Sequence, residues 1–180
     1  SYFSTRHEET GMIEKGRLWG TELPAPEWQG LGLLHHNYVS GITICIHRES
    51  WVETGFFNEA LHYGQDYDMW LRLISRYPAV FIPEWTCVSR YHAAQGSGLF
   101  LEACMYDSAK SAADFINANV FENYFPMLDL SEYKSAMRAA RETLRIAAAP
   151  DAFLYRLGPH AGLVLRLLDW AERAMPASRL

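Results

Sequence analysis

The sequence predicts an α/β unit over residues 1–98, followed by an all-helical region over residues 99–180. In the first part, segments that alternate between apolar and polar residues surround one segment of helical periodicity, residues 66–77. Beyond a Gly-rich break at residues 95–98, the chain becomes rich in Ala and Leu with helical periodicity, and prolines mark the joints. With 49% hydrophobic and 21% charged residues, the composition is that of an ordinary soluble globular protein with a substantial core.

Each element of the α/β unit follows from a local pattern. Ile42, Ile44 and Ile46 share one face of an alternating segment, which predicts a strand with one buried face. Pro78 is expected to end the helix over residues 66–77. The expected order is a hairpin over residues 1–20 with its turn at residues 8–11, a loop over 21–36, a strand over 38–47, a short helix capped by Ser50 and ending at Gly55, the helix over 66–77, and strands over 80–82 and 85–92.

The helical region is expected to contain helices over residues 99–119, 131–149 and 160–175. The second of these carries a basic stripe beside an apolar stripe. One interpretation is a helix that lies on an anionic membrane surface; the other is a helix packed on the α/β unit with a solvated basic edge. The last helix is expected to pack internally or against a second copy, which would make a homodimer. The basic stripe is Lys134, Arg138, Arg141 and Arg145, and the apolar stripe is Met137, Ala140, Leu144 and Ala147.

Charge and cysteine usage exclude several classes of protein. The net charge of −5 argues against a nucleic-acid partner, which would need a basic surface. The three cysteines, with no C-x-x-C pair, predict buried free thiols in a reducing compartment, and hence a cytoplasmic location. Neither an apolar run long enough for a membrane span nor a signal peptide is evident. Because the chain begins at Ser1 in strand-like sequence, we expect it to be a piece of a longer protein.

Three motifs between residues 54 and 92 carry the functional prediction. A turn with the sequence Gly-Phe-Phe-Asn-Glu occupies residues 55–59, and Gln65-Asp66 heads a helix that continues with Asp68 and residues 70–73 (Trp-Leu-Arg-Leu). Residues 89–92 read Ser-Arg-Tyr-His. In this order, the motifs resemble the second half of a family 2 glycosyltransferase with the GT-A fold, the fold of nucleotide-diphospho-sugar transferases. The resemblance covers residues 37–98 well and residues 1–20 loosely.

The resemblance implies a role for each matching residue. Asp66 corresponds to the catalytic base that accepts the proton of the acceptor hydroxyl in inverting transfer; the alternative is that Asp66 only caps the helix. Gly64 and Gln65 would shape the acceptor-side loop. Arg90 and His92 would lie on the diphosphate side of the nucleotide-sugar donor, with His92 also a ligand of a divalent cofactor metal, manganese or magnesium.

Departures from the family pattern limit this function. Gln65 stands where an acid is usual, and residues 1–36 contain no D-x-D metal motif. We therefore expect a C-terminal part of a glycosyltransferase, inactive alone because the donor-binding half is missing. The resemblance implies polysaccharide or glycolipid synthesis at the cytoplasmic side of a membrane. The alternative is a non-catalytic module that binds a glycan or a lipid headgroup.

Other polar and aromatic residues favour structural roles. The i,i+4 spacing of Asp68 and Arg72 predicts a solvated helical ion pair. Trp70 and Trp85 are expected in the core, and stacking on a sugar is the alternative for Trp85 at the start of its strand. The adjacent histidines at positions 35 and 36 are not expected to chelate one metal, because neighbouring side chains of an extended segment point to opposite sides.

Overall fold

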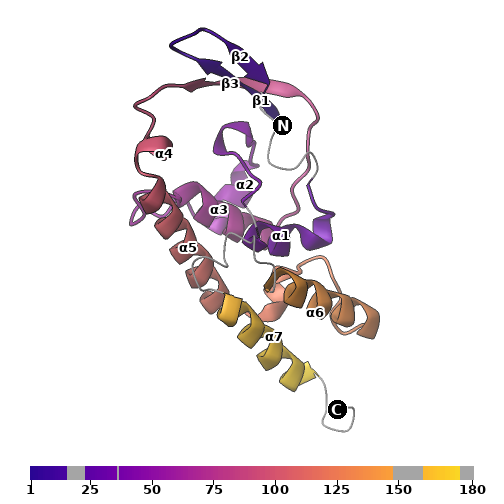
Figure 1. Ribbon diagram of the computed structural model, residues 1–180. Helices are drawn as coiled ribbons and strands as arrows, with labels where there is room; N and C mark the ends of the chain where they lie inside the picture. Colours follow the sequence, from indigo (N-terminus) through magenta and orange to yellow (C-terminus); the bar gives the residue numbers. More distant parts are fainter. Residues whose placement is uncertain (16–22, 36, 148–159, 175–180) are drawn as a thin grey trace.

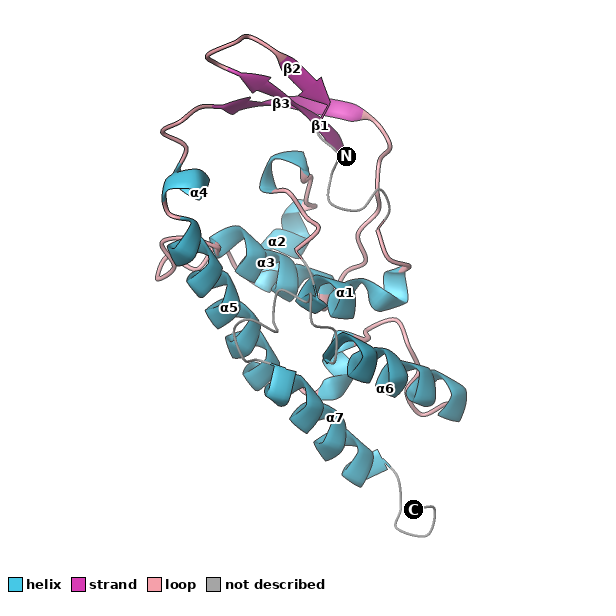
Figure 2. Cartoon of the chain, viewed as in Figure 1, coloured by secondary structure: helices cyan, strands magenta, loops and turns pink. Residues whose placement is uncertain are grey.

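The computed structural model describes residues 1–15, 23–35, 37–147 and 160–174 (Figure 1). A small sheet lies at one end of the molecule and the helices form the remainder (Figure 2), which confirms a mixed α/β architecture with further helices after it. The elements are β1 (Tyr2–His7), β2 (Ile13–Lys15), η1 (Pro26–Trp28), α1 (Gln29–His35), η2 (Gly41–Thr43), α2 (Arg48–Thr54), α3 (Gln65–Ile74), β3 (Trp85–Tyr91), α4 (Gly96–Leu99), α5 (Leu101–Ala118), η3 (Phe121–Tyr124), α6 (Tyr133–Ala147) and α7 (His160–Ala174).

The sheet has the strand order β2-β1-β3, with β1 antiparallel to β2 and parallel to β3. Gly11 adopts a φ of 68° in the turn between β1 and β2, a conformation that favours glycine. The predicted hairpin is thus confirmed, although residues 16–19 of its second strand lie outside the described residues. The strand predicted over residues 85–92 is confirmed as β3. Trp85 is not in the core: it is 45% exposed and stacks on Tyr2 with ring centroids 5.1 Å apart.

The core forms around α3. Six residues of this ten-residue helix are buried, against α1 on one side and α5 on another. The Tyr67 hydroxyl donates to the backbone oxygen of Leu33 at 2.9 Å, so the phenol is satisfied although fully buried. Burial raises the pKa of Tyr67 far above its ordinary value, which keeps the hydroxyl a donor. Trp70 is 4% exposed, as predicted for a core residue.

Two predicted strands are absent from the described part of the chain. Over residues 38–47 the structure has the single turn η2 and extended but unpaired backbone, and Ile42 and Ile44 remain 53% and 37% exposed. Residues 80–82 are likewise unpaired, and Val80 is 85% exposed. Alternation indicates which side chains would share a face, but a strand also needs a neighbour for its backbone hydrogen bonds. Among the described residues, neither segment has that neighbour.

The predicted loop over residues 21–36 is also wrong in its second half, where η1 and α1 form a helical segment. Pro26 occupies the first position of η1, where its missing N–H costs nothing. Gly30 lies where an added Cβ would be 2.8 Å from the backbone oxygen of Tyr124. This glycine is therefore a packing residue that lets α1 approach η3 closely, and it does not interrupt the helix.

Gln29, at the start of α1, joins two distant segments through its buried side-chain amide. Its Nε2 donates to the backbone oxygens of Ala79 at 2.8 Å and Pro24 at 3.2 Å, while its Oε1 accepts from the Ala79 N–H at 2.7 Å. Gln29 is 2% exposed, and both its amide nitrogen and its amide oxygen are hydrogen-bonded. It fixes Ala79, in the segment that leads from α3 to β3, onto α1.

Helix α3 ends at Ile74, three residues before the predicted end at Tyr77, so Pro78 does not terminate it. The predictions for α2 and α4 also differ from the structure. Helix α2 begins at Arg48 after His47, so Ser50 lies inside it and is not its cap; it ends at Gly55 as predicted, with φ 87°. The break at residues 95–98 contains the short helix α4. Helices α5, α6 and α7 confirm the three predicted helices over the residues that are described.

Two further predictions concern cysteines and membrane spans. All three cysteines are free, as expected, but Cys45 is exposed and Cys87 and Cys104 are only half-buried. None of the described helices combines the length and apolar character that a membrane-spanning helix requires.

Candidate functional site

Asp66 lies in the first turn of α3, one residue after the helix begins. Gly64 is the N-cap and adopts a left-handed conformation, so Asp66 is not the cap that the alternative interpretation required. Its Oδ1 accepts the N–H of Tyr67 at 2.7 Å. Its Oδ2 faces Gly41 of η2, where an added Cβ would lie 3.4 Å away. The carboxylate is half-buried between the start of α3 and η2, with one oxygen free of described hydrogen bonds.

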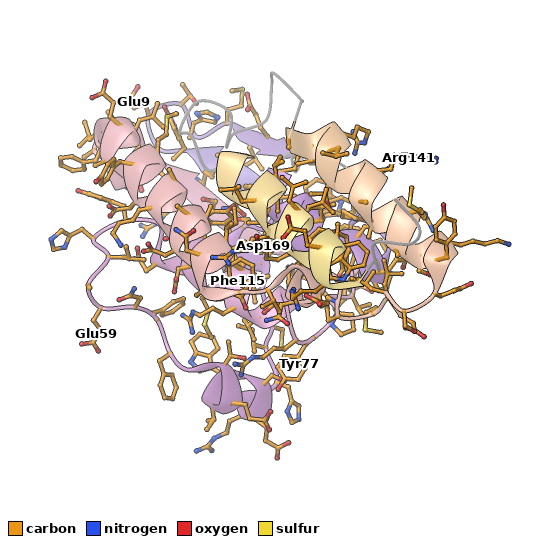
Figure 3. The ribbon with its side chains drawn as sticks, turned by 90° about the horizontal axis from the view of Figure 1, so that it is seen from below. Glu9, Glu59, Tyr77, Phe115, Arg141 and Asp169 are labelled. Atoms are coloured by element: carbon orange, nitrogen blue, oxygen red, sulfur yellow. The ribbon has the colours of Figure 1, made fainter. Side chains whose placement is uncertain are left out.

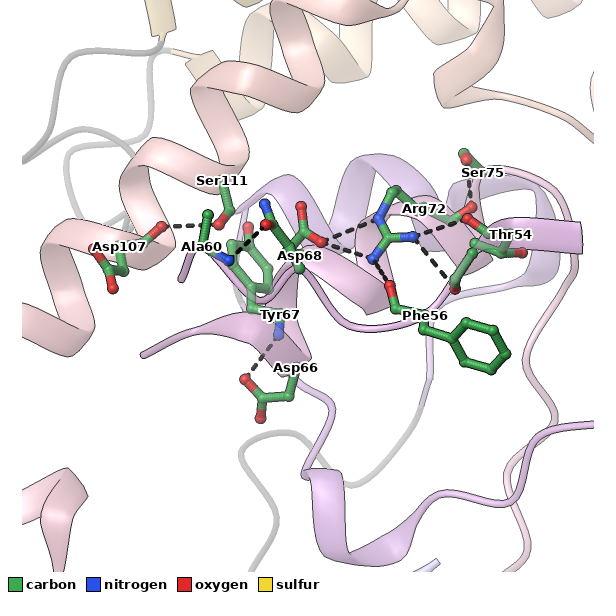
Figure 4. A network of polar contacts seen from close by, with 12 residues as sticks. Thr54, Phe56, Ala60, Asp66, Tyr67, Asp68, Arg72, Ser75, Asp107 and Ser111 are labelled. Atoms are coloured by element: carbon green, nitrogen blue, oxygen red, sulfur yellow. Dashed lines mark hydrogen bonds and ion pairs between the residues drawn. The ribbon is translucent and has the colours of Figure 1, made fainter. Parts of the chain in front are cut away.

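Asp68, two residues further on, is engaged in a different structure. Arg72 donates to its Oδ2 through Nε at 3.0 Å and Nη2 at 2.8 Å. The same guanidinium donates to the backbone oxygens of Thr54 at 2.8 Å and Phe56 at 2.9 Å (Figure 4). The spacing alone predicted a solvated ion pair, but this pair is largely buried: the side chains of Arg72 and Asp68 are 28% and 18% exposed. Arg72 satisfies carbonyls where α2 ends and fastens the turn over residues 55–59 to α3.

The two carboxylates are thus divided between two tasks. In Figure 4 the Asp66 carboxylate points away from the Asp68–Arg72 pair. Within the described residues, Asp66 forms no ion pair. Because Tyr67, Asp68 and Arg72 all hold α3 in place, Asp66 stands on a rigid support, which is what a positioned acid or base requires.

The loop before Asp66 is held by α5. The N–H of Tyr63 donates to Oδ2 of Asp107 at 3.0 Å. Gly64 packs so closely on Ser108 that an added Cβ would lie 3.0 Å from its Oγ and 3.2 Å from its backbone nitrogen. Gln65 is exposed at the first position of the helix. Sequence reasoning selected Gly64 and Gln65 but missed Asp107 and Ser108, which lie more than forty residues further along the chain.

Gly64→Ala is expected to lower the free energy of unfolding by about 1–2 kcal/mol, because a side chain at φ 66° is strained and Ser108 must also move. Chemical denaturation would measure this change. Gly96→Ala is the matched control, since a Cβ there would meet nothing within 4 Å. Equal stability of the two variants would contradict the tight packing of Gly64 on α5.

Cys104 of α5 lies near Asp107 and Asp66, and the sequence predicted no role for it in the site. Burial raises the pKa of its thiol, and the negative charges of Asp107 and Asp66 raise it further. The thiol is therefore held protonated beside the carboxylates and is a poor nucleophile. A helical spacing of three to four residues places Cys104, Asp107 and Ser108 on one side of α5, but that pattern does not reveal what they face.

Arg90 and His92 lie apart from Asp66 in the sheet region. Arg90 is on β3 with its side chain 77% exposed, and its Nη1 is 3.6 Å from Oε1 of Glu8. His92 follows the end of β3 and is half-buried; its backbone oxygen accepts the N–H of Gln95 at 3.0 Å. No described contact joins either residue to Asp66, which lies on the helical side of the molecule (Figure 1). The helix motif and the 55–59 turn are in contact, because Arg72 binds the turn. The motif over residues 89–92 has no described contact with either.

The side chains near Arg90 and His92 do not form a metal site among the described residues. The described residues contain no group of three or more His, Cys, Asp or Glu side chains that could hold a metal ion. His92 would be a single ligand, so these residues do not by themselves fit a divalent cation. His36 lies outside the described residues, and the Nδ1 of His35 is buried without a described partner.

Comparison with known proteins gives a relationship over part of the chain. Over 66 residues, or 37% of the chain, it is 38% identical to an uncharacterized glycosyltransferase of Rickettsia felis and 36% identical to an uncharacterized glycosyltransferase of Rickettsia conorii. The matched segment spans 10% of the length of each relative. No protein-family model matches the chain, and no solved structure matches it. The similarity supports a relationship to glycosyltransferases.

Proposed function

We propose that this chain is the acceptor-side part of an inverting family 2 glycosyltransferase with the GT-A fold, in which Asp66 is the catalytic base. The observation that carries the proposal is the contrast between two neighbouring carboxylates. The Asp68 carboxylate is bound by Arg72. The Asp66 carboxylate is oriented by the Tyr67 N–H at Oδ1, and its Oδ2 has no described hydrogen bond. The three motifs in family order and the partial similarity to glycosyltransferases add support.

In this reaction an acceptor hydroxyl attacks the anomeric carbon of a nucleotide sugar. The new C–O bond forms as the bond to the nucleoside diphosphate breaks, and the diphosphate leaves with the electron pair. The hydroxyl proton passes to the Asp66 carboxylate, which lies in the first turn of α3. Attack from the side opposite the leaving group inverts the configuration at the anomeric carbon.

Arg90 and His92 are proposed for the donor side. The exposed guanidinium of Arg90 would attract the diphosphate, exchanging its exposed ion pair with Glu8 for a more highly charged partner. In the complete protein His92, with ligands from outside this chain, would hold a divalent metal that supplies Lewis-acid stabilisation of the leaving group. The donor pocket would come from other parts of the protein, so the chain alone is proposed to be inactive. We place the reaction in polysaccharide or glycolipid synthesis at the cytoplasmic side of a membrane.

A transfer assay with the full-length protein and a panel of nucleotide sugars tests this function. We expect release of a nucleoside diphosphate and a glycosylated acceptor whose anomeric configuration, read by NMR, is opposite to that of the donor. The isolated chain serves as the control and should give no product. Glycan binding by the isolated chain without nucleotide, together with no transfer by the full-length protein, would instead favour the non-catalytic binding module.

A further inference from the structure

Helix α6 presents an outer face in which exposed apolar and cationic side chains are sorted into two parallel ridges. Its inner face is the set of buried residues Ala136, Ala139, Thr143 and Ile146, and α6 packs on α7. The apolar stripe predicted from the sequence therefore divides: Ala140 and Ala147 are half-buried, whereas Met137 and Leu144 are 37% and 50% exposed.

The exposed apolar ridge consists of Tyr133, Met137 and Leu144. At about 100° of rotation per residue, these three side chains fall within a sector of about 40°. Tyr133 is 68% exposed and is the most accessible of them. The fold covers part of Met137 and Leu144, and the exposed remainder of the ridge is available to another apolar phase.

The cationic ridge lies directly beside it. Lys134, Arg138, Arg141 and Arg145 are all exposed and fall within the next sector of about 60°. The one acid of α6, Glu142, lies beyond this sector, where it pairs with Arg145 at 2.7 Å. The guanidinium of Arg138 stacks 4.6 Å from the ring centroid of Trp28, which orients it without neutralising it. In Figure 3, Arg141 stands at the outer edge of the molecule.

From these two ridges we infer that α6 is a docking surface for an anionic lipid bilayer, lying parallel to its plane. Fifteen residues give a helix about 22 Å long. Along it the apolar ridge would enter the boundary between headgroups and acyl chains while the cations bind lipid phosphates and carboxylates. Four cations against one acid in α6, within a chain of net charge −5, concentrate positive charge on this face.

Charge and pattern favour a bilayer over the other occupants. Two copies of this helix face to face would bring eight cations together, which disfavours a symmetric dimer through α6. A nucleic acid would use the cations but would leave the adjoining apolar ridge in water. A bilayer surface uses both ridges at once.

Cosedimentation of the full-length protein with vesicles tests this inference. The protein should bind vesicles of phosphatidylcholine mixed with phosphatidylserine, and salt should weaken the binding. Replacing Lys134 and Arg141 with Ala should weaken it about fivefold for each charge removed. Met137→Ser with Leu144→Ser should also weaken it, because the apolar ridge contributes separately. Circular dichroism would verify that the variants fold.

The matched control replaces Arg48 and Lys110 with Ala, which removes the same charge from exposed positions on α2 and α5. An equal loss of binding in this control would overturn the inference. So would a parent protein that does not bind anionic vesicles. If the α6 variants instead convert a dimer to a monomer in sedimentation, the occupant is a second copy and the lipid assignment is wrong. The test needs no sugar donor, and Asp66→Asn should bind vesicles like the parent, so its outcome is independent of the proposed transfer activity.

Discussion

Asp66→Asn in the full-length protein is expected to lower the rate of sugar transfer by a factor of about 10²–10⁴, the usual contribution of a general base. An amide cannot take the proton of the acceptor hydroxyl, so the attacking oxygen keeps its proton as the new bond forms. The substitution is nearly isosteric, and an amide oxygen can still accept the Tyr67 N–H that Oδ1 accepts now. The fold and the binding of the donor should therefore persist while kcat falls.

The control for Asp66→Asn is Glu49→Gln, which removes a carboxylate that is 82% exposed on α2. Its rate of transfer should equal that of the parent. Donor binding can be followed by calorimetry in both variants, which separates a loss of chemistry from a loss of substrate. Transfer by Asp66→Asn at the parental rate would remove Asp66 from the role of base.

The largest effect on stability is expected from Arg72→Ala, at about 2–3 kcal/mol of the free energy of unfolding. The guanidinium serves one carboxylate and the backbone oxygens of Thr54 and Phe56. Its loss leaves the Asp68 carboxylate, only 18% exposed, without a counter-charge. An unpaired, largely desolvated charge and two orphaned carbonyls cost more than the ion pair itself contributes.

Urea denaturation of Arg72→Ala and four further variants would measure this effect and its origin. Arg72→Lys should recover little of the loss, because an ammonium cannot reproduce the fork that reaches several oxygens. Asp68→Asn with Arg72→Ala should cost less than the two single changes together, since they share one network. The ion pair of Lys110 and Asp114 has the same i,i+4 spacing but is exposed, so Lys110→Ala should leave stability unchanged. A similar loss in both Arg72→Ala and Lys110→Ala would refute the structural role of Arg72.

Local patterns predicted the elements whose stabilising partners are near or whose periodicity is long. Helix α3 was predicted because its apolar positions recur at helical spacing, and tertiary packing buries that face. Strand β3 was predicted correctly. It pairs with β1, some eighty residues away, and this neighbour accepts and donates its backbone hydrogen bonds. Residues 38–47 show alternation of the same quality, but no strand lies beside them among the described residues.

Helix α1 was missed because residues 21–36, which contain two prolines and two glycines, were predicted to be a loop. Gly30 is required by the close approach of the Tyr124 backbone, a contact between positions almost a hundred residues apart. No local pattern reveals such a contact. The apolar residues Leu31, Leu33 and Leu34, which are all buried, were the available signal for a helix here.

The candidate site was predictable in part for the same reason. Gly64, Gln65 and Asp66 were selected through motif order, and they lie at the start of α3. Asp107 and Ser108 reach this loop from α5, and the identity of that neighbour depends on how helices pack. The function of Arg72 was misjudged because spacing on one helix identifies Asp68 as its partner but not the carbonyls of residues 54 and 56.

The Gln29 amide bears on more than the stability of α1. Asp66 belongs to the helical body and Arg90 to the sheet, and Ala79 lies on the stretch of backbone that runs from one to the other. By holding Ala79 through both its N–H and its carbonyl, Gln29 fixes this connection to α1 six residues before β3 begins at Trp85. Gln29 therefore anchors one end of the connection that carries Arg90, although its side chain forms no described hydrogen bond with Asp66 or Arg90.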